Sequence, residues 1–118
     1  MGIGEEKSFA FAVKIVKTVK VIREQHREYD LTRQLVRSGT SIGANVSEAQ
    51  KAQSTKDFIS KLSIASKEAE ETRYWLRLLI ATEYLEETAG EELLSDVSEL
   101  IRILTSSVKT MQTKQLNT

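Results

Sequence analysis

Apolar residues recur along the chain at alternating spacings of three and four, the period of a helix with one buried face. The pattern divides the sequence into four helical segments at about residues 5–27, 31–52, 55–86 and 91–111. In the last segment, Leu93, Val97, Leu100 and Leu104 follow one another at spacings of 4, 3 and 4. A polar tail, residues 112–118, is expected to fray. The pattern therefore predicts an all-α protein.

The connections between these segments carry signals for helix ends. Asp30 is a candidate N-cap for the second helix, and Ser54 with Asp57 forms a capping box before the third. Ala89 and Gly90 are expected to end the third helix. Four amphipathic helices with short connections predict a single domain, residues 1–118, folded as an antiparallel up-down-up-down four-helix bundle.

Composition narrows the classes of function. The 118 residues suit one domain and include no cysteine, which excludes disulfides, thiolate metal sites and a cysteine nucleophile. The apolar stretch FAFAVKIVKTVKVI is interrupted by three lysines, so it resembles neither a membrane span nor a signal sequence. We therefore expect a cytoplasmic protein.

The net charge of zero hides an asymmetry. Residues 1–60 carry ten Lys or Arg and seven Asp or Glu, whereas residues 61–118 carry seven and ten. One interpretation is that these are solvated helix faces whose partners lie elsewhere in the bundle. The other is that the basic first helix attracts phosphate backbones. In that case the candidate nucleic-acid contacts are Lys14, Lys17, Lys20, Arg23 and Arg27.

No residue pattern indicates catalysis. The single histidine, His26, cannot supply the paired ligands of di-iron bundles or most zinc sites, and its place near a helix end suits a boundary residue. Glu68, Glu70 and Glu71 lie on one helix without further oxygen ligands for a cation. We predict no catalytic residues, no metal, no cofactor and no small-molecule substrate.

The second helix contains an unusual stretch, RSGTSIGANVSEA, at residues 37–49. Its helical period continues through Ile42, with Ser38 on the core face. A polar stripe is formed by Arg37, Ser41, Asn45 and Glu48. On the other side, Gly39 and Gly43 each cost about 1 kcal/mol relative to alanine, which implies a neighbour that needs the space. The polar stripe is expected to meet Glu68 and Glu71 of the third helix, or of another subunit. Both a packing role and a ligand or nucleic-acid contact remain open.

The third helix carries a second seam beside its core stripe. Its members are Ile64, Glu68, Glu71, Trp75 and Leu78, at spacings of 4, 3, 4 and 3, with Tyr74 alongside. A wide core face that absorbs Trp75 and Leu78 would explain the seam. A large exposed apolar surface would instead mark an interface. Val13 and Val21, among lysines on the first helix, favour the interface, and we predict a homo-oligomer.

These residues also resemble a known family. Leu31, Gln34, Leu35, Arg37, Ser38, Ser41, Ile42, Asn45 and Glu48 match the pattern L-x-x-Q-L-x-R-S-x-x-S-I-x-x-N-x-x-E of the bacterial four helix bundle protein family, also called the 23S rRNA-intervening-sequence protein family. The resemblance covers about residues 8–110. Two departures are Ala49, where a glycine often stands, and SKEAEET at 66–72.

The resemblance implies an antiparallel four-helix bundle without established enzyme activity, and some family members form ring-shaped homopentamers. A more distant similar bundle is the accessory protein of diversity-generating retroelements, a basic pentamer that binds nucleic acid. We therefore expect a non-enzymatic homo-oligomeric scaffold or adaptor, a pentamer by resemblance, with nucleic acid as a candidate partner. The alternative is a module that binds a different protein through Tyr74, Trp75 and Leu78.

Overall fold

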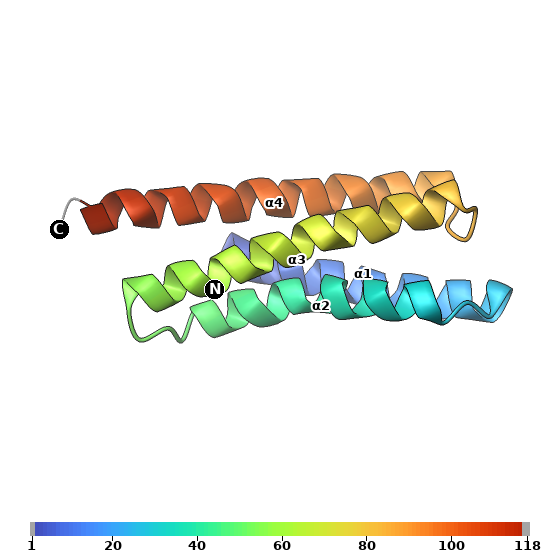
Figure 1. Cartoon of the computed structure of the whole chain (residues 1–118), viewed down its shortest axis with the longest axis horizontal. Helices are drawn as coiled ribbons and strands as arrows, with labels where there is room; N and C mark the ends of the chain where they lie inside the picture. The colour runs from blue at the N-terminus through green and yellow to red at the C-terminus, as the bar shows by residue number, and fades with distance from the viewer. Residues whose placement is uncertain (1, 117–118) are drawn as a thin grey trace.

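The computed structural model describes residues 2–116, which form four antiparallel helices (Figure 1). The helices are α1 (Ile3–His26), α2 (Asp30–Ala49), α3 (Thr55–Ala81) and α4 (Glu87–Leu116). Each helix packs against the next in the chain, and α4 returns to α1 with the least extensive contact of the four. The predicted four-helix bundle is confirmed. It measures 53 × 22 × 20 Å, with the α1–α2 and α3–α4 turns at the same end.

The core consists of the residues that the helical period places on one face. Phe11, Ile15, Val19 and Ile22 of α1 are buried, as are Leu35, Ile42 and Val46 of α2, Leu62, Leu76 and Leu79 of α3, and Leu93, Val97, Leu100 and Leu104 of α4. Between α2 and α3, the buried hydroxyls of Ser38 and Thr72 lie 3.0 Å apart. His26 is exposed, and its ring forms a T-shaped pair with the Tyr84 ring at 5.3 Å between centroids.

One predicted helix cap is confirmed and another is wrong. The Ser54 hydroxyl accepts a hydrogen bond from the Asp57 backbone N–H at 3.0 Å. Asp30 does not cap α2, because it is already the first helical residue. Instead the Glu28 carboxylate accepts the N–H groups of Asp30, Leu31 and Thr32 at 2.9–3.1 Å.

The predicted boundary between the third and fourth helices is also wrong. α3 ends at Ala81 rather than near residue 86, and the turn passes through Glu83 at φ 66°. Gly90 lies inside α4, where an added Cβ would stand 2.5 Å from Ile80 Cδ1. This glycine allows a close approach to α3 and does not stop a helix. At the other end, α4 continues to Leu116 through most of the expected tail, and residues 117 and 118 lie outside the described residues.

The glycines of α2 allow a close approach to α1. A Cβ at Gly39 would lie 3.0 Å from the Ile15 side chain, and one at Gly43 would lie 3.3 Å from the backbone oxygen of Ser8. Gly39, Ile15 and Ser8 are buried. The neighbour that the two glycines imply is therefore the first helix of the same chain.

We predict that Gly39→Val lowers the free energy of unfolding by about 2–3 kcal/mol, because the new side chain overpacks against Ile15. Valine has a higher helix propensity than glycine, so a loss of stability at Gly39 would come from packing. Arg33→Val, on the exposed side of the same helix, introduces valine without overpacking and should cost less than about 1 kcal/mol. Urea unfolding followed by circular dichroism measures both. Equal losses would show that the space at Gly39 is not needed.

A second prediction concerns Glu28. Burial acts to raise its pKa, but the hydrogen bonds from Leu31, Thr32 and Asp30 outweigh burial and lower the pKa from the ordinary 4.5. The carboxylate therefore stabilises the fold above its unfolded-state pKa, and this contribution is lost as the pH falls through the lower folded-state value.

We expect Glu28→Ala to cost about 1 kcal/mol at neutral pH, the usual value of a helix cap. Urea unfolding at neutral and acidic pH should show the gap between wild type and variant closing in acid. A gap that does not change with pH would contradict the capping role.

Candidate interaction surfaces

An apolar surface runs along the outer side of α1 and α2. Phe9, Val13 and Val16 form a row on α1 and are 71%, 38% and 42% exposed. A groove of about 640 Å³ adjoins this row. Its apolar and small lining residues are Phe9, Ala12, Thr40, Gly43, Ala44 and Ser47. We call the row and the groove together the α1–α2 face.

Opposite charges lie at the two ends of the α1–α2 face. Glu5 and Glu6 line the groove near the start of α1, and Lys17 and Lys20 lie beside Val13 and Val16 toward the end of that helix. Within residues 2–116, none of these four charges has an ion-pair partner. The face thus has an apolar centre, an acidic end and a basic end.

Neither Phe9 nor Val16 is among the interface residues that the sequence predicts. The signal is nevertheless present, because Phe9, Val13, Val16 and Lys20 follow one another at spacings of 4, 3 and 4. α1 therefore carries two apolar rows, and only the one through Phe11 and Ile15 enters the core. Val21 is exposed, as expected, but it does not line the groove.

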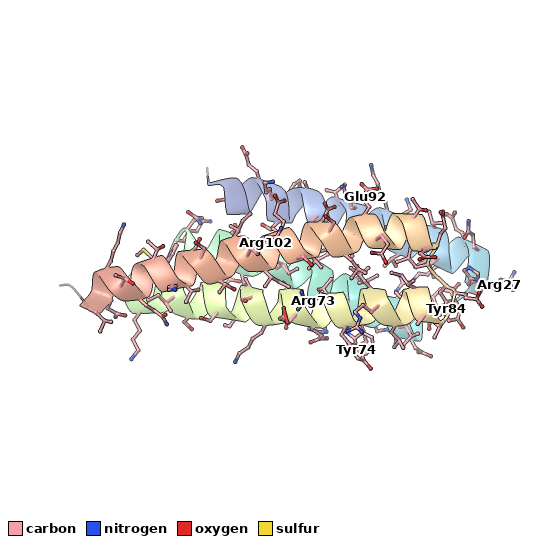
Figure 2. The ribbon with its side chains drawn as sticks, turned by 90° about the horizontal axis from the view of Figure 1, so that it is seen from above. Arg27, Arg73, Tyr74, Tyr84, Glu92 and Arg102 are labelled. Atoms are coloured by element: carbon pink, nitrogen blue, oxygen red, sulfur yellow. The ribbon has the colours of Figure 1, made fainter. Side chains whose placement is uncertain are left out.

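The seam predicted on α3 is partly exposed. Ile64 and Tyr74 are 41% and 57% exposed, whereas Trp75 and Leu78 are half-buried. We call these four residues the α3 ridge. The Tyr74 and Trp75 rings meet edge to face at 5.1 Å between centroids. In Figure 2, Tyr74 lies on the side of α3 away from α4.

The acidic members of the predicted seam pair with Arg37 in the same chain. The Arg37 guanidinium donates to Glu68 Oε2 at 3.0 Å and also to Glu71. The Trp75 indole N–H donates to Glu71 Oε2 at 3.0 Å. This bond, together with Arg37, lowers the pKa of Glu71 from the ordinary 4.5 against the opposing effect of burial. The polar stripe therefore meets Glu68 and Glu71 of the third helix in the same chain, which is one of the two arrangements that the sequence predicts.

The other polar residues of the α2 stripe have partners in α2 itself or in the neighbouring α3. Ser41 donates to the Arg37 carbonyl oxygen at 2.8 Å, and Asn45 donates to the Ser41 carbonyl oxygen at 2.9 Å. Glu48 pairs with Lys61 of α3 at 3.2 Å. The Ser41 and Asn45 bonds stay within α2, and of these contacts the Glu48–Lys61 pair reaches α3.

The five basic residues predicted to contact nucleic acid differ in whether they already have partners within the bundle. Lys14 pairs with Asp96 at 2.8 Å and Glu92 at 3.1 Å on α4, which raises its pKa. Arg23 donates to Thr32 and lies over the Tyr29 ring. Arg27, Lys17 and Lys20 are exposed. Two of the five candidate residues are thus already engaged within the bundle.

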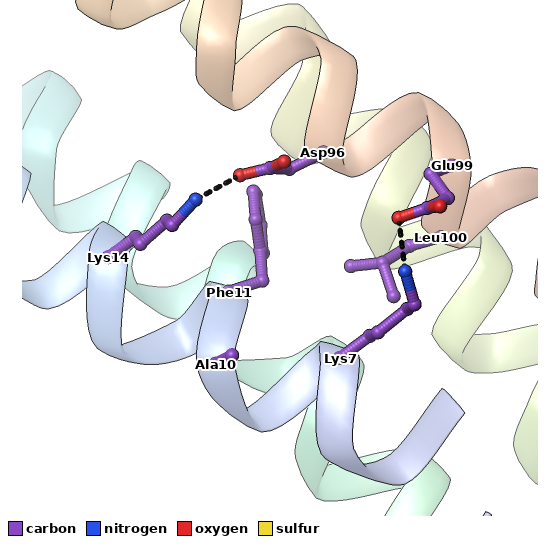
Figure 3. A pocket seen from close by; sticks show the side chains of 7 residues that line it. All are labelled: Lys7, Ala10, Phe11, Lys14, Asp96, Glu99 and Leu100. Atoms are coloured by element: carbon purple, nitrogen blue, oxygen red, sulfur yellow. Dashed lines mark hydrogen bonds and ion pairs between the residues drawn. The ribbon is translucent and has the colours of Figure 1, made fainter. Parts of the chain in front are cut away.

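A small pocket of about 140 Å³ lies between α1 and α4 (Figure 3). Phe11 and Leu100 line it, and the ion pairs Lys7–Glu99 and Lys14–Asp96 lie across it. The charged groups of the pocket neutralise one another, and the pocket is the space between two helices joined by ion pairs.

The described residues contain no cluster of three or more acidic, histidine or cysteine side chains placed to hold a metal ion. None of the helices among them is long and apolar enough to cross a membrane.

Comparison with known proteins places the chain beside a protein family and a solved structure. The family described as 23S rRNA-intervening sequence protein matches residues 5–106. A crystal structure of a protein of unknown function, from the S23 ribosomal protein family of Bacteroides thetaiotaomicron VPI-5482, is 48% identical to the chain with a TM-score of 0.89. The similarity covers 91% of this chain and 99% of that one. No curated protein matches the chain.

Trp75 is the only tryptophan, so its fluorescence reports on the Glu71 contact. Because the folded-state pKa of Glu71 is lowered, its carboxylate should protonate only as the pH falls below 4.5. We predict a fluorescence step there, at a pH where circular dichroism still shows the intact bundle. Glu71→Gln should lack the step, whereas Glu70→Gln should keep it. A step that survives Glu71→Gln would contradict the assignment.

Proposed function

The chain belongs to the 23S rRNA-intervening sequence protein family, and we propose that it is a non-enzymatic scaffold or adaptor that assembles with copies of itself. The observation that carries the proposal is the α1–α2 face. Phe9, Val13 and Val16 expose apolar surface in one row, next to a groove lined with small residues. Contiguous apolar surface of this kind on a globular domain usually marks an interface.

The dimensions of the bundle suit such an interface. A stable contact buries about 800 Å² on each partner. The bundle is 53 Å long and about 20 Å across, so one long side offers enough surface. Burial of apolar side chains contributes about 25 cal/mol per Å², and the exposed α1 row is the apolar centre that such a contact needs.

We expect the assembly to be a pentamer, from the family resemblance. In a closed ring, each copy presents the same two surfaces to its neighbours. The cellular task of such a scaffold would be to present several identical surfaces to a partner at once.

Two other partners have weaker support. For nucleic acid, Lys14 and Arg23 are already engaged within the chain, and the net charge is zero. For a different protein, the exposed Tyr74 of the α3 ridge offers an anchor, since aromatic side chains often dominate binding energy. A chain that stays monomeric alone and gains mass only with a second protein would support this alternative.

The self-association is tested by light scattering after size exclusion. The chain has a mass of 13.3 kDa, and we expect the wild type to elute at a multiple of it. Val16→Asp places a charge in the apolar row and should shift the protein to 13.3 kDa. Val21→Asp changes an equally exposed valine of α1 outside the groove and should leave the assembly intact. A monomeric wild type at micromolar concentration would overturn the proposal.

A further inference from the structure

A groove between α3 and α4 is lined by polar and basic side chains that the proposed scaffold role does not use. Its volume is about 550 Å³, and we call it the α3–α4 groove. We propose that it binds the phosphate or diphosphate group of a small ligand. The inference does not depend on self-association. The polar and basic residues that line the groove are Ser63, Ser66, Lys67, Thr105, Lys109 and Gln112.

The hydrogen-bond donors of the α3–α4 groove are not used within the bundle. Among residues 2–116, none of these six side chains has a hydrogen bond or ion pair with another part of the chain. Ser63 and Ser66 are nevertheless half-buried. By contrast, the half-buried hydroxyls of Thr40, Ser41 and Ser107 each donate to the backbone oxygen one turn earlier. The groove therefore presents hydroxyl groups that can donate to an acceptor from outside the chain.

The α3–α4 groove also carries positive charge that no carboxylate balances. Lys67 of α3 and Lys109 of α4 both line it, and its lining residues include no acid. Glu70, one turn along α3 from Lys67, is held by Arg73 at 2.8 and 2.9 Å. Residues 100–116 of α4 include three basic residues and no acidic one. An anion in the groove would therefore be attracted by both lysines.

The donor set suits a phosphate group. Lysine ammonium groups, hydroxyls and side-chain amides are the groups with which proteins contact phosphate oxygens. Phosphate offers more acceptor oxygens than a carboxylate does, which matches a groove with donors on both sides. From Thr105 to Gln112 the α4 side spans about 10 Å, at a rise of about 1.5 Å per residue. This length accommodates a diphosphate, whereas a strand of nucleic acid would extend beyond the two lysines.

Isothermal titration calorimetry with sodium pyrophosphate tests the inference, at low ionic strength in a buffer without phosphate. We expect saturable binding of one pyrophosphate per chain. Lys67→Gln and Lys109→Gln should each weaken binding about tenfold, the usual effect of losing a hydrogen bond to a charged group. Lys20→Gln is the matched control, because it removes the same charge from an exposed site on α1 outside the groove. It should change the affinity by less than about twofold, since distant surface charges are screened.

A variant that combines Ser63→Ala with Ser66→Ala tests the hydroxyls without a change of charge. It should weaken pyrophosphate binding by about threefold or more. Circular dichroism should show that each variant remains helical. An unchanged affinity in the folded serine variant would contradict a site built from these donors.

Three other outcomes would overturn the inference. The first is the absence of saturable pyrophosphate binding to the folded wild type. The second is equal weakening by Lys20→Gln and Lys67→Gln, which would indicate general attraction to a basic surface. The third is binding of a short single-stranded oligonucleotide by a protein that does not bind pyrophosphate, which would indicate a surface for a strand. Self-association is measured separately by light scattering, so failure of one proposal is distinguishable from failure of the other.

Discussion

The close approach of α1 and α2 at Gly39 and Gly43 is the constraint on which the other features depend. At these positions a methyl group would meet the Ile15 side chain or the backbone of Ser8. Two glycines in one helix cost about 2 kcal/mol relative to alanine. The packing of Ile15, which is fully buried, offsets this cost. The same approach also shapes the outer surface, because Gly43 lies between the α1 backbone and the groove beside Phe9.

Ion pairs between helices account for part of the charge asymmetry along the sequence. Basic side chains of the first half reach acidic ones of the second: Lys7 pairs with Glu99, Lys14 with Asp96, and Arg37 with Glu68. Exposed ion pairs of this kind contribute at most about 1 kcal/mol each. They favour one pairing of helices over others more than they add stability. Of the two interpretations of the asymmetry, partners within the bundle account for these three residues.

Sequence periodicity predicts the fold well because a buried helix face requires apolar residues at spacings of three and four. Leu35, Ile42 and Val46 share one face even though two glycines interrupt the stretch. Helix ends are less predictable, because they depend on side chains that compete for the same N–H groups. Glu28 outcompetes Asp30, and Gly90 serves packing against Ile80 rather than helix termination. The sequence does not show whether a glycine ends a helix or allows close packing inside one, because the residue is the same in both cases.

The candidate surfaces show the same limit. The Arg37 pairing with Glu68 and Glu71 follows from the polar stripe and its spacing, and the structure places it within one chain. The α1–α2 face is not predicted when each helix is assumed to have one apolar stripe, which is buried. It requires knowing which apolar row of α1 enters the core and which remains outside. Only tertiary packing decides between the rows through Phe11 and Phe9.

The central claim is that the exposed apolar row of α1 is covered by copies of the same chain. Small-angle X-ray scattering of the unmodified protein over a range of concentrations tests it directly. A single bundle has a Cα radius of gyration of 15.1 Å. The account predicts a clearly larger value that persists on dilution into the low micromolar range. A radius that remains near 15.1 Å at every concentration would contradict it.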